Sequence, residues 1–322
     1  MVRRDSCALS AAGVEALVEA FGERAERDAP LGARTTYRVG GRAAISVRID
    51  SHEDLRALHR ALVVAGRPVP LVVVGQGSNL LVSDAGFAGV VVSLGNGFDW
   101  VEVRSQQVRA GGATPYPVVA RRSAAAGLRG LEWAVGVPGS VGGALAMNAG
   151  GHGSDTAAVL ARYCSYDLES GVEAEHEAER LAFGYRHSAL GPGELVLWAQ
   201  FDLERAEPAD TSLSVSEVVR WRRAHQPGGP NAGSVFTNPP GDAAGRLVEA
   251  AGLKGSRIGS ACVSEKHANF IQADEGGSAD DVRRLIEHVR AEVAVRTGVD
   301  LATEVRLVGF EDVPPTLVHA RG

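Results

Sequence analysis

Residues 75–80, Gly-Gln-Gly-Ser-Asn-Leu, and residues 136–143, Gly-Val-Pro-Gly-Ser-Val-Gly-Gly, are the two stretches that decide the fold of this chain. Both are glycine-rich loops, and the first directly follows a short apolar strand predicted at Pro70–Val74. No Lys or Arg occurs from Pro68 to Val103 or from Gly130 to Ala161. A phosphate bound here would therefore be held by backbone N–H groups and hydroxyls, which is an established kind of anion site. Two such loops predict a long diphosphate ligand.

Neither loop matches a standard nucleotide fingerprint. The Rossmann pattern needs a third glycine three residues after Gly77, where this chain has Leu80, and an acidic residue about 20 positions further on. The P-loop pattern is absent. Taken alone, Gly75–Gly77 also fits a tight turn, and residues 136–143 also fit close helix–strand packing. The density of glycines in the second loop, and its Pro138-Gly139-Ser140 entry to a helix, favour contact with a ligand.

Composition excludes several classes of protein. At 322 residues the chain is long enough for two or three domains, and its formal net charge of −6 argues against nucleic-acid binding. Cys7, Cys164 and Cys262 are too far apart for a metal motif, which fits a reducing compartment. Arg3-Arg4 is not followed by an apolar segment, and no apolar run could span a bilayer. We therefore expect a cytoplasmic protein with no metal, nucleic-acid partner or membrane contact.

The periodicity of apolar residues predicts an α+β protein rather than a strictly alternating one. A composition change at Ala206–Ser216 predicts a domain boundary. The expected helices are 9–27, Ser51–Ala65, Pro117–Ala126, Ser216–Ala224 and Ala279–Thr297. The expected strands are Ala43–Ile49, Pro70–Val74, Val90–Leu94, Trp100–Val103, Gln107–Ala110, Arg162–Asp167, Glu194–Leu203 and Val299–Val308.

Several polar residues outside the glycine loops are candidates for chemistry, but each also has an ordinary structural explanation. Ser234 could form a turn or a cap, and Arg186 could be a solvent-exposed cation. Glu304 and Arg306 share one face of a predicted strand and could pair there, worth about 0.2–1 kcal/mol if exposed. The remaining candidates with a structural alternative are Asn148, His152 and His267.

In combination, seven segments resemble the UDP-N-acetylenolpyruvoylglucosamine reductase family, whose flavoenzymes complete UDP-N-acetylmuramate for peptidoglycan synthesis. They are, in order, Thr36–Gly41, Gly75–Gly86, Gly127–Gly153, Phe183–Ser188, Asn231–Pro239, Leu253–Phe270 and Leu301–Gly309. The resemblance implies a two-lobed FAD-binding region of the vanillyl-alcohol-oxidase type at residues 1–206, with lobes at about 1–94 and 95–206. It also implies an α+β substrate-binding domain at residues 207–322.

The resemblance further implies the chemistry. A hydride passes from NADPH to FAD and then to C3 of the enolpyruvyl ether, in ping-pong fashion. Arg186 would pair with the substrate carboxylate, Ser234 would protonate C2, and Glu304 would polarise the carboxylate, as a neutral acid if burial raises its pKa. The implied FAD contacts are Gly75, Gln76, Gly77, Ser78, Asn79, Leu80, Gly139, Ser140, Gly142 and Asn148. The implied substrate contacts are Asn238, His267 and Arg306.

Three residues depart from the family pattern: Thr237 replaces a usual lysine, Gln76 a common glycine and His152 a frequent aromatic residue. The stretch between Arg186 and Ser234 is too short for the tyrosine-bearing capping loop of one subgroup, which predicts the subgroup without it. We expect a monomer that binds a UDP-sugar and NADPH. The alternatives are another FAD-dependent oxidase or dehydrogenase of the same fold, and a non-catalytic flavin- or nucleotide-binding protein.

Overall fold

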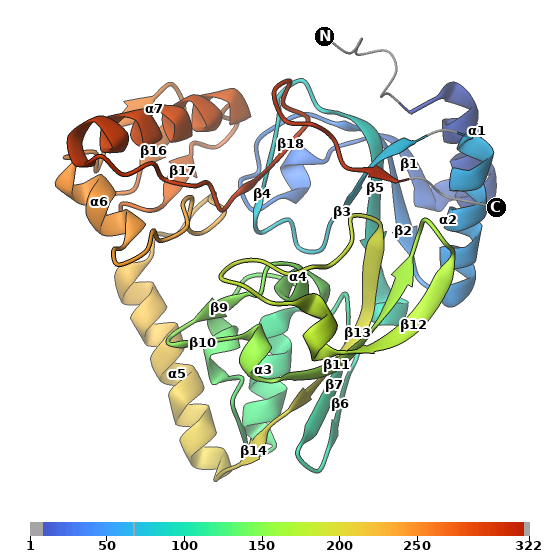
Figure 1. Cartoon of the computed structure of the whole chain (residues 1–322), viewed down its shortest axis with the longest axis horizontal. Coiled ribbons are helices and arrows are strands. Elements are labelled where there is room, and N and C mark those ends of the chain that lie inside the picture. Colours follow the sequence, from blue (N-terminus) through green and yellow to red (C-terminus); the bar gives the residue numbers. More distant parts are fainter. Residues whose placement is uncertain (1–8, 67, 319–322) are drawn as a thin grey trace.

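Two five-stranded sheets form the centre of the protein, a computed structural model that describes residues 9–66 and 68–318 (Figure 1). A smaller C-terminal part lies beside them, joined by a long helix. The mixture of helices with parallel and antiparallel strands confirms the predicted α+β class. Arg3, Arg4 and Cys7 lie outside the described residues.

The first sheet has the strand order β1-β2-β5-β3-β19. Its three central strands are parallel, and both edge strands pair antiparallel. Two helices pack on it and bury Leu17, Leu55 and Leu58 in one core with Ile45 and Val47. The bounds are α1 (Ala11–Phe21), β1 (Ala25–Ala29), β2 (Ala43–Ile49), α2 (His52–Ala65), β3 (Val69–Val73), β5 (Phe87–Leu94) and β19 (Leu317–Val318).

The second sheet is antiparallel throughout, with the order β12-β11-β13-β7-β6. Its core contains Tyr116, Trp133 and Phe201, which lie in one cluster with residues of the second glycine loop's helix. The bounds are β6 (Val101–Arg104), β7 (Gln107–Gly111), α3 (Tyr116–Ala125), β8 (Leu128–Arg129), η5 (Glu132–Gly136), α4 (Val141–Ala146), β9 (Gly150–Gly151), β10 (Ser154–Asp155), β11 (Leu160–Asp167), β12 (Val172–Glu177), β13 (Glu194–Asp202) and β14 (Glu204–Arg205). Short 3-10 turns occupy η2 (Gly22–Arg24), η3 (Gly32–Arg34), η4 (Asn96–Phe98), η6 (Thr156–Ala158) and η7 (Ala178–Leu181).

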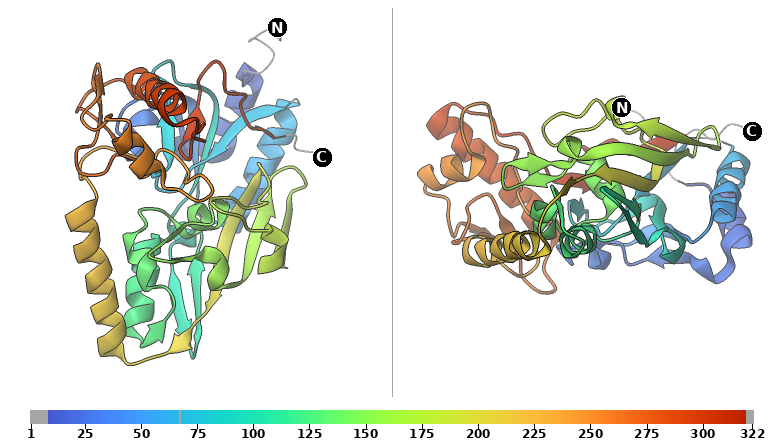
Figure 2. Two further views of the ribbon diagram at one scale, coloured as in Figure 1. Left: turned by 60° about the vertical axis from the view of Figure 1, so that its left-hand side comes forward. Right: turned by 90° about the horizontal axis from the view of Figure 1, so that it is seen from below.

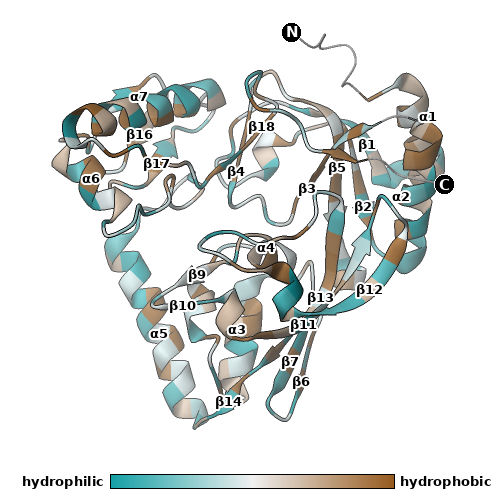
Figure 3. Cartoon of the chain, in the orientation of Figure 1, coloured by the Kyte–Doolittle hydropathy of each residue, from teal (hydrophilic) through white to brown (hydrophobic). Residues whose placement is uncertain are grey.

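The C-terminal part contains a small three-stranded sheet packed against one long helix. Helix α7 turns Val282, Leu285, Ile286, Val289 and Val293 into the core, and Figure 3 shows the matching mixture of apolar and polar residues along it. The bounds are α5 (Pro208–His225), α6 (Ala244–Ala250), β15 (Arg257–Ile258), β16 (Ala261–Val263), β17 (Ile271–Ala273), α7 (Ala279–Thr297) and β18 (Arg306–Val308).

Contacts of three kinds fasten the C-terminal part to the first half of the chain. Strand β18 pairs in parallel with β4 (Leu80–Val82). Asp84, just after β4, accepts hydrogen bonds from the Ser278 hydroxyl (2.6 Å) and the Ala279 N–H (3.0 Å) at the start of α7. Tyr37 and Leu81 belong to the same apolar cluster as the buried face of α7. The strand that follows the first glycine loop is therefore held directly against the C-terminal segment.

Three predicted elements differ from the structure. The helix expected at 9–27 ends at Phe21, because Gly22 adopts a φ of +54° and the chain then enters β1. The helix expected at 216–224 begins earlier, at Pro208, a residue favoured in the first helical turn. In Figure 2 this helix, α5, runs along one side of the molecule from the second sheet to the C-terminal part.

The third difference is the strand expected at 299–308, of which only Arg306–Val308 forms a regular strand. Upstream of it, the chain runs irregularly beside residues 235–237, with hydrogen bonds from the Thr237 N–H to the Ala302 carbonyl and from the Glu304 N–H to the Val235 carbonyl. Leu301 and Val305 are nevertheless buried, whereas Asp300 and Ala302 are exposed. Among the described residues, no helix has the length and apolar character needed to cross a membrane.

Candidate active site

A pocket of about 530 Å³ lies where the two sheets and the C-terminal part meet. This volume is typical of small-molecule sites, which span about 300–1,000 Å³. Its walls come from both glycine loops, the β9–β10 hairpin, the end of α5, the 231–234 loop and the segment leading into β18. The three predicted catalytic residues, Arg186, Ser234 and Glu304, all line it.

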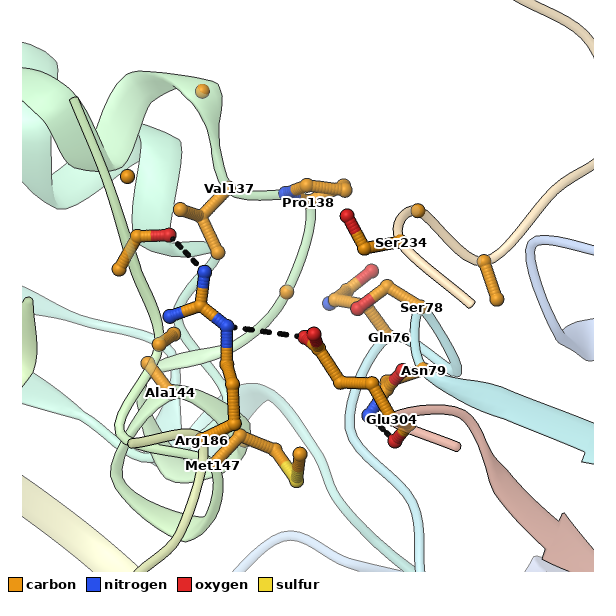
Figure 4. A pocket seen from close by; sticks show the side chains of 18 of the residues that line it. Gln76, Ser78, Asn79, Val137, Pro138, Ala144, Met147, Arg186, Ser234 and Glu304 are labelled. Atoms are coloured by element: carbon orange, nitrogen blue, oxygen red, sulfur yellow. Dashed lines mark hydrogen bonds and ion pairs between the residues drawn. The ribbon is translucent and has the colours of Figure 1, made fainter. Parts of the chain in front are cut away.

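Arg186 and Glu304 form an ion pair inside the pocket, with 3.1 Å between Nε and Oε1 (Figure 4). The Arg186 guanidinium also donates to the carbonyls of Gly150 (2.9 Å) and Asn148 (3.5 Å). Its backbone adopts a φ of +55°, uncommon for a residue with a side chain. These contacts hold the guanidinium in one orientation with part of its edge facing the pocket.

Burial governs the charge of Glu304, whose side chain is only 14% exposed. Desolvation raises the pKa of its carboxyl above the ordinary value, and the neighbouring Arg186 opposes this rise. The Glu304 peptide is fixed as well, because its N–H donates to Val235 (2.8 Å) and its carbonyl accepts from the Asn79 side chain (3.1 Å). Glu304 is thus held by groups from three distant segments, its carboxyl by Arg186 and its backbone by Val235 and Asn79.

Ser234 reaches the pocket through a turn at Gly233, whose φ is +77° and whose N–H donates to the Asn231 side chain (3.0 Å). Two residues further on, Asn269 binds both polar groups of the Phe236 backbone. Its Oδ1 accepts from the Phe236 N–H (3.0 Å) and its Nδ2 donates to the carbonyl (2.9 Å). In Figure 4 Ser234 lies on the same side of the pocket as Gln76 and Ser78, opposite Arg186. Asn269 was not identified from the sequence.

The two glycine loops pack against each other and fit a bound diphosphate. A side chain at Gly75 would collide with the Ser140 hydroxyl, and one at Gly139 would lie 3.3 Å from the Ser78 hydroxyl. Both loops line the pocket and present only backbone groups, hydroxyls and neutral side chains. Backbone N–H groups so arranged can bind phosphate oxygens. Val137, Ala144 and Met147 add an apolar wall for a ring system, so these residues fit FAD.

Of the predicted cofactor contacts, Gly75 to Leu80, Gly139 and Ser140 line the pocket, whereas Gly142 and Asn148 do not. The Asn148 side chain is engaged elsewhere, donating to Asp155 (3.1 Å) and to the Gly184 carbonyl (3.0 Å). These bonds give it the structural role that the sequence left open beside ligand contact. Both assignments remain predictions.

Among the predicted substrate contacts, Arg306 lines the pocket and Asn238 and His267 do not. The Arg306 side chain faces the pocket, and the protein around it lowers the pKa of its guanidinium by desolvation. The Asn238 Oδ1 accepts from the Ala244 N–H (3.0 Å) at the start of α6. The His267 ring packs on Phe270, with 4.8 Å between centroids, and burial lowers its pKa. For ligand contact, all three remain predictions.

Sequence reasoning missed a group of pocket residues at the end of α5. Trp221 contacts His152 edge-on, with 4.8 Å between ring centroids. Arg222 lies over Gly136, where a Cβ would come within 2.7 Å of the arginine Cδ. Within the described residues its guanidinium forms no hydrogen bond or ion pair, and burial lowers its pKa. The close approach at Gly136 explains a glycine of the second loop that ligand contact alone does not require.

Comparison with known proteins agrees with this arrangement. Residues 43–166 match a family model described as an FAD binding domain, and residues 225–308 match one described as the C-terminal domain of UDP-N-acetylenolpyruvoylglucosamine reductase. A protein of Rubrobacter xylanophilus with that enzyme name is 41% identical over 88% of this chain and 95% of its own length. One of Symbiobacterium thermophilum is 43% identical over 89% of this chain and 92% of its own length.

A solved structure supports the same assignment at the level of the fold. The crystal structure of the UDP-N-acetylenolpyruvylglucosamine reductase from Thermus caldophilus is 34% identical to this chain, with a TM-score of 0.78. It matches 88% of this chain and 99% of that protein. With relatives above 40% identity along most of its length, this chain belongs to the UDP-N-acetylenolpyruvoylglucosamine reductase family.

Proposed function

We propose that this protein reduces UDP-N-acetylglucosamine enolpyruvate to UDP-N-acetylmuramate, a precursor of peptidoglycan, using NADPH and bound FAD. The observation that carries the proposal is the convergence of Arg186, Ser234 and Glu304, from three separate segments, on one pocket bordered by both glycine loops. Membership of the reductase family supports the same activity. The alternative functions do not require these three side chains together.

When bound, FAD supplies the hydride carrier between NADPH and C3 of the enolpyruvyl group. The chain's own contribution is to stabilise the charge that then develops at C2 and on the adjacent carboxylate. Arg186 is suited to this role because its guanidinium is already oriented by Glu304 and two backbone carbonyls. Preorganised charge of this kind is often the largest catalytic contribution. Glu304, with its pKa raised by burial, would in its neutral form donate a hydrogen bond to the carboxylate.

Ser234 would complete the reaction by protonating C2. Its O–H bond breaks as the C2–H bond forms, and water returns a proton to the serine oxygen. A serine hydroxyl is a weak acid, but a carbanion stabilised as an enolate is basic enough to take its proton. NADPH and the substrate would use the pocket in turn, which predicts ping-pong kinetics.

An anaerobic absorbance titration tests the proposal. NADPH should bleach the flavin band near ~450 nm, and the enolpyruvate should restore it. Ser234→Ala should preserve bleaching and abolish restoration. Equal loss of both half-reactions would remove the proton-donor role, and flavin that the enolpyruvate cannot reoxidise would reject the reductase assignment.

The two alternatives give different results in the same cuvette. An oxidase or dehydrogenase of the same flavin fold would be reduced by an alcohol and reoxidised by O₂, without consuming NADPH. A non-catalytic flavin- or nucleotide-binding protein would show no change in any rate in Ser234→Ala.

The proposal includes a boundary between an FAD-binding region, residues 1–206, and a substrate-binding domain, residues 207–322. The two matched family models fall on either side of residue 206. Two segments that follow this boundary contact the FAD-binding region: helix α5 packs against α3 and η5 of the second lobe, and strand β19 joins the first sheet. We also infer a monomer in the cytoplasm; light scattering on the purified holoenzyme would measure the oligomeric state.

A further inference from the structure

The first glycine loop is connected to Glu304 through Asn79. Asn79 lies at the end of this loop, immediately before β4. Its side-chain Nδ2 donates to the Glu304 carbonyl (3.1 Å), and its backbone carbonyl accepts from the Arg306 N–H (3.0 Å). The parallel pairing of β4 with β18 continues from this point, with Leu80 opposite Arg306. The end of the cofactor loop and the Glu304 segment therefore share one hydrogen-bonded edge, visible in Figure 4.

The other side of Glu304 is anchored to the Ser234 loop. The Glu304 N–H donates to the carbonyl of Val235, the residue after Ser234, at 2.8 Å. The peptide before Glu304 is thus fixed by the Ser234 loop. The peptide after it is held mainly by Asn79, with a longer contact from the Val305 N–H to the same Val235 carbonyl (3.5 Å). Arg186 contacts only the carboxylate, at 3.1 Å. Removal of the Asn79 amide would take away the side-chain hydrogen bond to the Glu304 carbonyl. The ion pair, the Ser234 loop and the backbone pairing at Arg306 would stay in place.

We propose that Asn79 is a positioning residue for Glu304, rather than chiefly a cofactor contact, and that its side-chain amide makes the cofactor loop and the carboxylate one geometric unit. The inference rests on the proposed function for its kinetic consequence, but not for its structural one. Displacement of a catalytic group by about 1 Å can cost about 100-fold in rate. Asn79 should therefore affect the step that uses Glu304 more than the binding of FAD.

The kinetic test compares the two half-reactions in holoenzyme carrying Asn79→Ala or Asn79→Asp. Both variants lack the Nδ2 donor, and the second retains the size of the side chain. We expect reoxidation by the enolpyruvate to slow about 10- to 100-fold, with flavin reduction by NADPH and FAD retention changed less than about twofold. Ser78→Ala is the matched variant, since Ser78 lies on the same loop but does not contact Glu304; it should weaken FAD retention instead.

A double-mutant cycle separates positioning from a direct role. If Asn79 acts through Glu304, adding Asn79→Ala to Glu304→Ala should cause no further loss of reoxidation rate. Independent, multiplicative losses would overturn the proposal, as would a loss of FAD retention as large as the loss of rate.

A second measurement does not depend on the reaction. Hydrogen exchange of the holoenzyme, followed in peptides that cover residues 301–309, should be about 2- to 10-fold faster in Asn79→Ala, the factor that one net hydrogen bond is worth. Unchanged exchange there would refute the positioning role even if the wild type proved unable to reduce the enolpyruvate. Failure of the wild-type enzyme with this substrate would instead reject the proposed function alone.

Discussion

The Asn269→Ala variant should destabilise the protein and slow the step that requires Ser234. Asn269 is 4% exposed, and its amide satisfies both polar groups of the Phe236 backbone, which is 1% exposed. A buried polar group left without a partner costs about 1–3 kcal/mol, so two groups cost about 2–6 kcal/mol. The Val235 N–H keeps its hydrogen bond to the Asn269 backbone carbonyl, so the loop stays attached. We therefore expect the lower part of this range, about 2–4 kcal/mol.

Urea unfolding of the holoprotein, followed by tryptophan fluorescence, measures this loss. A typical stability of about 5–15 kcal/mol leaves the variant mostly folded, so its half-reactions can be measured on the same sample. Reduction by NADPH should be preserved and reoxidation by the enolpyruvate slowed. Asn96→Ala is the control, because Asn96 is exposed and should change stability by less than about 0.5 kcal/mol. A loss below about 1 kcal/mol in Asn269→Ala, with an unchanged reoxidation rate, would refute the reasoning.

Three further predictions concern charge, a buried hydroxyl and packing. Burial raises the pKa of Glu304, so its neutral form persists to higher pH than that of a free carboxyl. Reoxidation should therefore slow as the pH rises through that pKa. In a stopped-flow pH profile, Glu304→Gln should abolish this decrease in rate at high pH. Among the residues that the structure describes, the buried Tyr37 hydroxyl has no hydrogen-bond partner. Tyr37→Phe should therefore leave stability unchanged or raise it by up to about 1–3 kcal/mol, and a clear loss in urea unfolding would contradict this. Arg222 lines the pocket and is a candidate contact for the anionic ligands. Gly136→Ala would displace its side chain, so KM for these ligands should rise in this variant and in Arg222→Met. Normal KM values in both variants would exclude a role for Arg222 in binding.

Local patterns in the sequence were sufficient for many elements. Ser51 and Asp54 form the capping box that starts α2. Helix α7 has the predicted bounds, Ala279–Thr297, with Ser278 as its N-cap and Gly298 as its C-cap. Strand β1 could not be found in this way, because its Glu-Arg-Asp centre is exposed and polar, and it exists as an edge partner of β2. The irregular course of residues 299–305 likewise depends on hydrogen bonds to residues 235–237, which no local pattern records.

For the site, the sequence identified the residues but not the ion-pair and hydrogen-bond partners of their side chains. The sequence offered a pairing of Glu304 with Arg306 across one strand face as the ordinary structural explanation of both residues. The structure instead pairs Glu304 with Arg186, which leaves Arg306 facing the pocket. For Asn238 the sequence motif correctly lies beside the site, but the side chain accepts a hydrogen bond from the first residue of α6 and does not line the pocket. Burial and competition among hydrogen-bond partners decide such cases, and both depend on the tertiary fold.

The connections around Glu304 suggest why the glycine loops and the catalytic residues occur in one chain at such wide separations. Strand pairing between β4 and β18 brings the end of the cofactor loop beside Glu304, and Val235 brings Ser234 to its other side. Arg186, which belongs to the second lobe, forms an ion pair with Glu304 across the pocket. Because Glu304 is held by both lobes and by the C-terminal part, the position of its carboxyl depends on the relative positions of all three. The side-chain amides of Asn79 and Asn269 bind backbone groups beside Glu304 and Ser234, so variants at both positions should affect reoxidation.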